Sequence, residues 1–379
     1  MDEGNNMKLL HTADLHIGKT IYEFSMLEDQ KYILEEILQI AREEQINGFL
    51  LAGDIYDRSV PSTEAVQLLE WFLLKALAIA PVFMIAGNHD SAERLSFGAS
   101  LLEKSGLYIA GGKEVKEVLV EDAFGKVAIH LLPFVKPAVV GAGNGEEAVD
   151  NQLKLLKAGW KAADRHVLLS HFFVCARGKE PELSDSEVHS FVGGLEQVDV
   201  SLFEDYDYVA LGHIHKPQCM KRGQTYYAGS PLCYSFSEAA TDKGVNIIEV
   251  SQAGDVRIDH KILHPLHRMR IIKGSLSELM SQGNESESGR EDYIQAILTD
   301  RDELIDPIGS LRSVYPNTMQ IVLEKRLAEG NVLAFHGAEC NQRTMEELFE
   351  SFYESLTGEP LDAERLAVVQ QVAAEVEGV

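Results

Sequence analysis

The sequence of 379 residues contains only four cysteines, and their spacing excludes two common roles for this residue. None belongs to a Cys-x-x-Cys pair, so neither a disulfide framework nor a thiolate zinc knuckle is indicated. We therefore interpret all four as plain core or surface thiols. They are Cys175, Cys219, Cys233 and Cys340.

The sequence also lacks an apolar run long enough to cross a bilayer. The stretch around residues 73–82 is broken by Lys75 and Pro81 and falls short of the roughly 20 residues that a spanning helix needs. The first residues carry neither a basic region nor a long apolar segment, which argues against a signal peptide. We expect a cytoplasmic protein with no membrane partner.

Basic residues are scarce relative to acidic ones: 34 Lys and Arg against 60 Asp and Glu give a formal net charge of -26. This balance argues against a nucleic-acid partner, because duplex binding normally depends on basic side chains that neutralise phosphates. The acidic residues are unevenly distributed, however, since residues 345–379 contain nine Asp or Glu and one base, Arg365. An acidic tail repels DNA locally, and bound divalent cations change the field of a distant groove. The net charge therefore does not exclude a DNA substrate.

Residues 8–171 alternate short apolar runs with segments of helical period, the pattern of β and α units that pack as layers. A helix is expected after Ser25, where Glu28 completes a capping box. A second helix is expected over residues 62–80. The expected strands cover residues 8–12, 48–53, 82–86, 166–170 and 208–211.

Beyond residue 211 the chain is predicted to be rich in strands, over residues 224–228, 244–250 and 256–263. Near His264 the character changes with a basic cluster, and a small second domain is expected over about residues 264–335. Within it, residues 281–292 are polar and indicate an exposed loop. The basic cluster consists of His264, His267, Arg268, Arg270 and Lys273.

Five short motifs carry the chemistry, and each lies at or just after the end of an expected strand. Loops at the carboxyl ends of strands meet at one edge of a sheet, where a rigid scaffold can position side chains. Glycines in three of the motifs are expected to permit sharp turns directly after the strands. In chain order the motifs are Asp14-Leu15-His16, Gly53-Asp54-Ile55-Tyr56-Asp57, Gly87-Asn88-His89-Asp90, Ser170-His171 and Gly212-His213-Ile214-His215.

The residue types of these motifs fit a pair of divalent cations. Two such ions about 4 Å apart need oxygen and imidazole nitrogen ligands, with a carboxylate between them to reduce their repulsion. Each motif alone is weak evidence, because an isolated Asp-x-His is more often a surface loop and a lone histidine is more often a hydrogen-bonded core residue. The five together, in this order and at strand ends, make chance a poor explanation.

The motif set resembles that of the calcineurin-like metallophosphoesterase superfamily, and further segments resemble its bacterial DNA-end-processing nucleases. Those segments are His11 to Gly18, Tyr208 to His215, Tyr227-Ala228-Gly229-Ser230-Pro231 and Tyr234-Ser235-Phe236-Ser237-Glu238. The resemblance implies an α/β protein with a layered α/β/β/α sandwich over residues 1–263. It also implies a small α+β capping domain over residues 264–335 and C-terminal helices over residues 336–379.

The resemblance also implies the role of each motif residue. One cation would be held by Asp14, His16, Asp54 and His215, and the other by Asp54, Asn88, His171 and His213, so that Asp54 is the bridge. His89 would face the scissile phosphate as a general acid or a charge stabiliser. Relatives often carry histidine at the position of Asp57, whose role is left open; orientation of a ligand is preferred over direct substrate contact.

The resemblance implies metal-dependent hydrolysis of DNA phosphodiesters, as a 3'-5' exonuclease and endonuclease that acts on ends and hairpins in DNA repair, recombination and replication. The residues themselves leave cleavage polarity and endonuclease activity open. Mn2+ fits the mixed oxygen and nitrogen ligands better than Mg2+ does, while iron or zinc stays open. The alternatives are a nucleotidase or small phosphodiesterase with the same site, and a scaffold without chemistry. Scaffold members typically lose ligands, and none is missing here. Arg58, Arg94, Arg177 and Lys179 lie near the motifs and are equally well interpreted as phosphate contacts or as solvated cations.

The end of the chain predicts two amphipathic helices. One begins at Thr344, where Glu347 completes a capping box, and stops before Gly358 and Pro360; the other follows Asp362. Both apolar stripes could pack on their own domain, but the aromatic composition of the first suits a helix-in-groove interface. The resemblance supplies the expected partner, a long coiled-coil ATPase, and a homodimer within the complex.

Overall fold

Two six-stranded sheets face each other at the centre of the protein. The computed structural model describes residues 6–161, 163–176, 180–187, 197–221, 223–285, 287–300, 302, 304–324 and 365–366. The first sheet has the order β16-β15-β1-β4-β5-β6 and the second β13-β14-β12-β9-β8-β7. The strands of the first are β1 (Met7–Thr12), β4 (Gly48–Ala52), β5 (Val82–Ile85), β6 (Leu107–Ala110), β15 (Gly244–Val250) and β16 (Val256–Ile262). Those of the second are β7 (Lys116–Asp122), β8 (Gly125–Leu132), β9 (Arg165–Ser170), β12 (Tyr208–Leu211), β13 (Gln218–Lys221) and β14 (Thr225–Tyr227).

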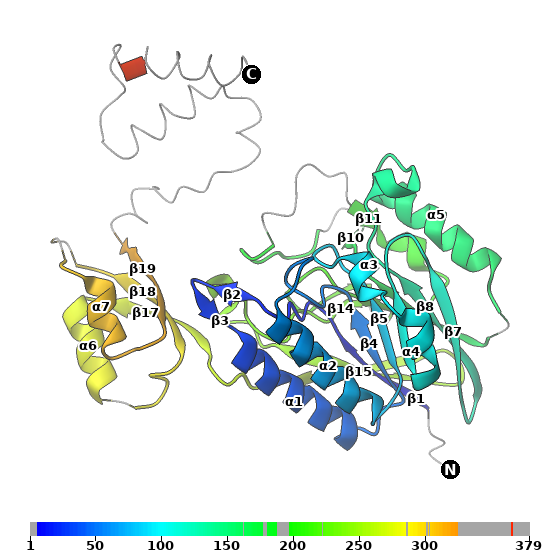
Figure 1. Ribbon diagram of the computed structural model, residues 1–379, viewed down its shortest axis with the longest axis horizontal. Coiled ribbons are helices and arrows are strands. Elements are labelled where there is room, and N and C mark those ends of the chain that lie inside the picture. Colours follow the sequence, from blue (N-terminus) through cyan, green and yellow to red (C-terminus); the bar gives the residue numbers. More distant parts are fainter. Residues whose placement is uncertain are drawn as a thin grey trace.

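Helices cover the outer faces of this sandwich (Figure 1). The helices α1 (Leu27–Glu43) and α2 (Thr63–Leu77) pack on the first sheet, and α5 (Gly145–Ala158) packs on the second. Between the sheets lies an apolar layer to which Leu9, Leu50 and Ile129 contribute fully buried side chains. The resulting order of layers is α/β/β/α, as the resemblance implied.

The parallel pairing of neighbouring strands determines where the motif loops lie. In the first sheet β1 pairs in parallel with β4 and β4 with β5, and in the second β9 pairs in parallel with β12. The loops that follow these five strands therefore emerge at the carboxyl ends of their sheets. Those ends carry all five motifs.

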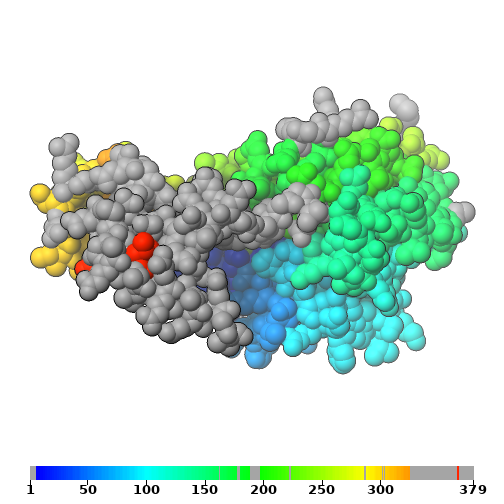
Figure 2. Space-filling view, turned by 90° about the horizontal axis from the view of Figure 1, so that it is seen from above, coloured from blue at the N-terminus to red at the C-terminus, as the bar shows by residue number. Residues whose placement is uncertain are grey.

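A second, smaller unit follows β16. Its strands β17 (Met269–Gly274), β18 (Tyr293–Leu298) and β19 (Thr318–Leu323) form one parallel sheet, with α6 (Leu276–Glu285) and α7 (Pro307–Arg312) in the connections. Figure 2 shows this unit, in yellow and orange, at one end of the molecule. It is tied to α1 through Asp29, whose buried carboxylate accepts hydrogen bonds from the Tyr293 hydroxyl at 2.7 Å and the His267 backbone N–H at 3.1 Å. The domain limits at residues 263 and 335 remain predictions.

Several local expectations agree with the structure and two are wrong. The helix expected over residues 62–80 is α2, with Ser62 as its N-cap, and the strand expected over residues 48–53 is β4. The capping box at the start of α1 does not form, because Met26 is the N-cap and makes no side-chain cap. The loop expected over residues 281–292 begins too early, since α6 continues to Glu285. The two C-terminal helices lie outside the described residues, apart from 365–366.

The described cysteines Cys175, Cys219 and Cys233 are free thiols, as expected. Among the described residues, no helix is long and apolar enough to span a bilayer.

Candidate metal centre

The motif loops are joined by hydrogen bonds that their backbone N–H groups donate. The loop after β1 and the loop after β4 run side by side, with the Asp14 N–H donating to Gly53 O at 3.0 Å and the His16 N–H to Asp54 O at 2.9 Å. The loop after β12 joins them because the His213 N–H donates to the Asp14 carboxylate at 2.9 Å. Loops from both sheets therefore share one rigid backbone frame.

Four candidate ligands have backbone conformations that side chains other than glycine rarely adopt. The φ angles are +53° for Asp14, +44° for His16, +48° for Asp54 and +97° for His213. Residues held in such conformations carry strain that persists only where the surroundings fix them, and they cluster at functional sites. The fold thus gives up some stability to aim these four side chains.

The motif glycines serve close approach more than turning. Gly53 has a φ of +91°, as a sharp turn requires, but Gly87 is not among the residues with positive φ. A Cβ atom on Gly87 would lie 2.1 Å from the Asp54 carboxylate oxygen Oδ1. The expectation of a turn therefore holds for Gly53, whereas Gly87 is glycine because Asp54 occupies the space beside it.

On one side of Asp54 lie the side chains of Asp14, His16 and His215. The Nε2 atoms of His16 and His215 are 3.1 Å apart, and His16 Nε2 is 3.7 Å from Asp54 Oδ2. Asp14, His16 and His215 each offer a ligand atom within 4.8 Å of those of the other two, and all three are buried. We name this group the His215 half-site.

On the other side of Asp54 lie Asn88, His171 and His213. His171 Nε2 is 3.4 Å from Asp54 Oδ2 and 3.0 Å from Asn88 Oδ1, and His213 Nδ1 is 2.9 Å from the same Asn88 oxygen. We name this group the His171 half-site. Asp54 Oδ2 thus lies between the two half-sites, and the structure brings together all seven residues that the motifs singled out as ligands.

Two of the buried candidate ligands have pKa values far from their usual range. Burial raises the pKa of Asp14 to about 8, with Asp54 adding to the rise. Burial lowers the pKa of a histidine, but Asp54 and Asp14 outweigh it and raise the pKa of His171 to about 9. In the chain alone, protons therefore take up the charge that divalent cations neutralise at such carboxylate and imidazole sites. The donor set fits divalent cations.

His89 lies beside the seven residues and is held through its other ring nitrogen. Its Nδ1 donates to the Asp57 carbonyl oxygen at 3.0 Å, and its backbone N–H donates to Asp54 Oδ1 at 2.9 Å. His89 lines a small cavity together with Asp54, Asn88 and His213. With Nδ1 engaged, Nε2 is the ring nitrogen left to meet a substrate.

Asp57 supports His16. Its Oδ1 atom lies 3.5 Å from His16 Nδ1 and 2.6 Å from Lys19 Nζ. Burial opposes the charged form, but the interactions with His16 and Lys19 outweigh it and hold the pKa of Asp57 well below its usual range. These contacts fit the preferred interpretation of Asp57 as a residue that orients a ligand.

Sequence reasoning assigned no role to Asp90, although it belongs to a motif. Its carboxylate accepts backbone hydrogen bonds from Gly87 and Tyr56 at 2.9 Å and from Ile55 at 3.0 Å. It therefore fastens the loop after β5 to the loop after β4. The position of Asp90 beside Asn88 and His89 was the signal that could have identified it.

The basic residues near the motifs divide into two groups. Arg94 donates to the Ser59 carbonyl oxygen at 2.9 Å, and the Arg58 side chain is 75% exposed. Arg177 and Lys179 lie outside the described residues. Arg58 and Arg94 are both exposed, and Arg58 Nε also lies 3.7 Å from Asp57 Oδ2.

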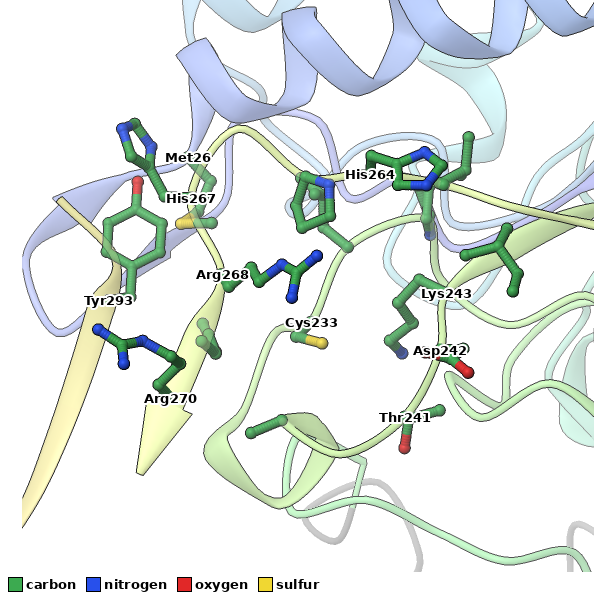
Figure 3. A pocket seen from close by; sticks show the side chains of 17 residues that line it. Met26, Cys233, Thr241, Asp242, Lys243, His264, His267, Arg268, Arg270 and Tyr293 are labelled. Carbon is green, nitrogen blue, oxygen red and sulfur yellow. The ribbon is translucent and has the colours of Figure 1, made fainter. Parts of the chain in front are cut away.

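A separate cavity of about 330 Å³ lies between the sandwich and the second unit (Figure 3). Part of the basic cluster lines it, including His264, Arg268 and Arg270. Neighbouring acids contact part of this cluster, since His264 Nδ1 lies 2.8 Å from Glu36 Oε1 and Arg270 forms an ion pair with Asp292. Lys243 also lines the cavity and extends from it toward the candidate metal centre.

Comparison with known proteins identifies the family of the chain. A family model described as calcineurin-like phosphoesterase matches residues 7–217, and one described as type 5 capsule protein repressor C-terminal domain matches residues 265–357. Two curated relatives, each named as the SbcD component of the nuclease SbcCD, are 31% identical to the chain. The relative from Staphylococcus saprophyticus aligns over 97% of both chains, and that from Staphylococcus epidermidis over 94% of this chain and 95% of its own. A solved Thermus thermophilus structure, TT1561, covers 68% of this chain and 99% of its own at 12% identity and a TM-score of 0.42.

The layered sheets, the clustered carboxylates and imidazoles and the match over residues 7–217 define the class: the chain is a calcineurin-like phosphoesterase, a metal-dependent hydrolase. Identity of 31% along nearly the whole length goes further. The chain belongs to the SbcD family.

Proposed function

We propose that the protein is the nuclease subunit of an SbcCD-type complex and hydrolyses DNA phosphodiesters at a two-metal centre. The observation that carries the proposal is the position of Asp54 Oδ2, 3.7 Å from His16 Nε2 and 3.4 Å from His171 Nε2. A carboxylate between two imidazole groups is the arrangement that a bridged pair of cations requires. Asp14, His16, Asp54 and His215 would hold one cation, and Asp54, Asn88, His171 and His213 the other.

The cations would activate a water and offset charge on the phosphoryl oxygens. The chain contributes position and a proton. His89 keeps its Nδ1 proton on the Asp57 carbonyl, so its Nε2 can carry the proton that the departing oxygen needs. The strained loops and the Asp90 hydrogen bonds hold the ligands in place before the substrate arrives.

Mn2+ is the proposed cation, because the set of carboxylate, amide and imidazole ligands suits it better than Mg2+, which favours oxygen ligands. DNA is the proposed substrate because both named relatives are nucleases, and we propose 3'-5' exonuclease and endonuclease activity on ends and hairpins in repair, recombination and replication. Their name also supports assembly with a partner subunit, for which we propose an SbcC-type coiled-coil ATPase. Two copies of the chain in the complex and a cytoplasmic location are further parts of the proposal. The predicted C-terminal helices are the proposed docking segment.

Cleavage of DNA labelled at either end tests the proposal. Linear duplex, hairpin DNA and nucleotide monophosphates are incubated with purified protein and Mn2+, Mg2+ or EDTA. We expect Mn2+-dependent shortening from 3' ends and opening of hairpins, with nucleotides unchanged. Release of phosphate from nucleotides without DNA cleavage would instead establish the nucleotidase alternative. The absence of any hydrolysis with two bound cations would favour the scaffold.

A further inference from the structure

The backbone N–H, the carbonyl oxygen and Nδ1 of His215 are each held by a residue outside the motifs, whereas its Nε2 faces His16 Nε2 at 3.1 Å. Its backbone N–H donates to Glu187 Oε1, and its carbonyl oxygen accepts from Lys243 Nζ at 2.7 Å. Its Nδ1 atom lies 2.8 Å from Ser186 Oγ. Glu187 and Lys243 are buried, and Ser186 is half-buried. None of these three residues belongs to the five motifs.

The hydroxyl of Ser186 is in turn linked to a buried ion pair. Ser186 Oγ lies 2.9 Å from Glu238 Oε1, and Glu238 Oε2 lies 2.6 Å from Lys243 Nζ. Lys243 directs its three ammonium protons at Glu238, the His215 carbonyl and, at 3.0 Å, Ser230 Oγ. Each ammonium proton of Lys243 thus has an acceptor, so neither charge of the buried Lys243–Glu238 pair is left uncompensated.

The direction of the hydrogen bonds follows from the charge on Glu238. Burial would raise the pKa of Glu238, but Lys243 outweighs it and holds that pKa below its usual value. An ionised carboxylate only accepts, so Ser186 donates its single proton to Glu238 and offers His215 a lone pair. Ser184 Oγ, 2.8 Å from Ser186 Oγ, does not change this, since it can give its own proton to Ser186 or to Glu187. His215 must then carry its proton on Nδ1.

We propose that Ser186, Glu238 and Lys243 are positioning residues that fix His215 as the Nδ1–H tautomer, so that its Nε2 lone pair faces the cation of the His215 half-site. The proposal rests on the proposed metal role of His215. It also gives a function to Glu238 and its neighbours, which lie in a segment that the motifs left without one. An imidazole whose second nitrogen is held in this way is a stronger and better aimed ligand.

Ser186→Ala tests the proposal, and Ser235→Ala is its matched control. Ser235 donates to the same Glu238 Oε1 atom at 2.7 Å but has no described contact with His215. Mn2+ binding to the full chain is measured by calorimetry. Separately, nitrogen-15 spectra of histidine-labelled, metal-free protein report the tautomer of His215, whose signals are assigned from their loss in His215→Gln.

For the wild type we expect the Nδ1–H tautomer and two bound Mn2+. In Ser186→Ala the affinity for one Mn2+ should fall about 10- to 100-fold, the other should bind as before, and the His215 signals should shift toward a mixture of tautomers. Ser186→Thr should restore both readouts, and Ser235→Ala should match the wild type. Glu238→Gln should lower the affinity for the same Mn2+ ion.

Three results would overturn the proposal: an unchanged tautomer and affinity in Ser186→Ala, an equal loss in Ser235→Ala, or no rescue by threonine. With two Mn2+ still bound to the wild type, such a result would leave the proposed function standing. A wild-type protein that binds no Mn2+ would contradict both the positioning proposal and the proposed function. The metal-free spectra judge the tautomer independently of activity, so the two failures are distinguishable.

Discussion

The two half-sites differ in what holds their histidines. In the His171 half-site, His171 Nδ1 donates to the carbonyl oxygen of Ala52, a fully buried residue at the end of β4, at 2.7 Å. In the His215 half-site, side chains support both histidines: Asp57 lies against His16, and Ser186 against His215. A backbone carbonyl cannot be removed by substitution, whereas a supporting side chain can. The support of His16 and His215 is therefore open to substitution in a way that the support of His171 is not.

Asp54→Asn should have the largest effect, because Asp54 belongs to both half-sites and the substitution should weaken both of them together. Mn2+ content should fall at both sites and DNA cleavage should drop below detection. The fold should be retained, since an amide oxygen can still accept from the His89 N–H. Metal analysis, a cleavage assay and thermal unfolding check this, with Asp150→Asn on the outer helix α5 as control. Full activity at saturating Mn2+ would show that Asp54 is not the bridge.

His89→Ala should have the next largest effect and should leave both half-sites intact. Its side chain is proposed to deliver a proton and to bind no metal, so turnover should fall by roughly 10²- to 10⁴-fold while two Mn2+ remain bound. Single-turnover cleavage with parallel metal analysis measures both. If one cation were lost instead, His89 would be a ligand and the assigned roles would need to be exchanged.

Asp57→Asn should affect only the His215 half-site. Without the charge beside His16 Nδ1, the affinity for one Mn2+ should fall about 10- to 100-fold, and excess Mn2+ should restore cleavage. A Mn2+ titration of activity and binding distinguishes the two interpretations of Asp57. A lower turnover at unchanged Mn2+ affinity would favour direct contact with the substrate.

Removal of the residues after Asn341 should have the smallest effect on the metal centre, because both half-sites lie within residues 14–215. The shortened chain should keep metal-dependent cleavage of simple substrates but should fail to co-purify with the coiled-coil ATPase. Co-purification from cells that express both proteins checks this. Complex formation at unchanged affinity would show that the tail packs on its own domain.

Short-range patterns were sufficient for much of the fold and for the ligand set. The strand over residues 48–53 and the helix over residues 62–80 were predictable because apolar periodicity and the Ser62 cap agree there. The Asp-x-His and Gly-Asn-His-Asp patterns identified side chains that parallel strands bring to one edge. Local sequence carries both kinds of information.

Long-range packing decided what the sequence did not predict. The strand β7 was missed because Val118 is its one buried residue among charged neighbours, so it has little alternation. Helix α6 includes Gly283, although the local sequence predicts a loop there. Glycine is needed at this position because a side chain would collide with Val314 and Tyr315 of the neighbouring segment. Ser186 and Lys243 contact His215 from 29 and 28 positions away, and Glu238 acts through Ser186. No local pattern encodes such a spacing.

The central claim is that one chain holds two cations that share Asp54, and electron paramagnetic resonance of the Mn2+-loaded protein tests it most directly. Ions bridged by a carboxylate interact magnetically, so a titration should end at two Mn2+ per chain with the spectrum of a coupled pair, and Asp54→Asn should abolish that spectrum. A titration that ends at one Mn2+, or two ions that give the spectrum of isolated Mn2+, would contradict the account.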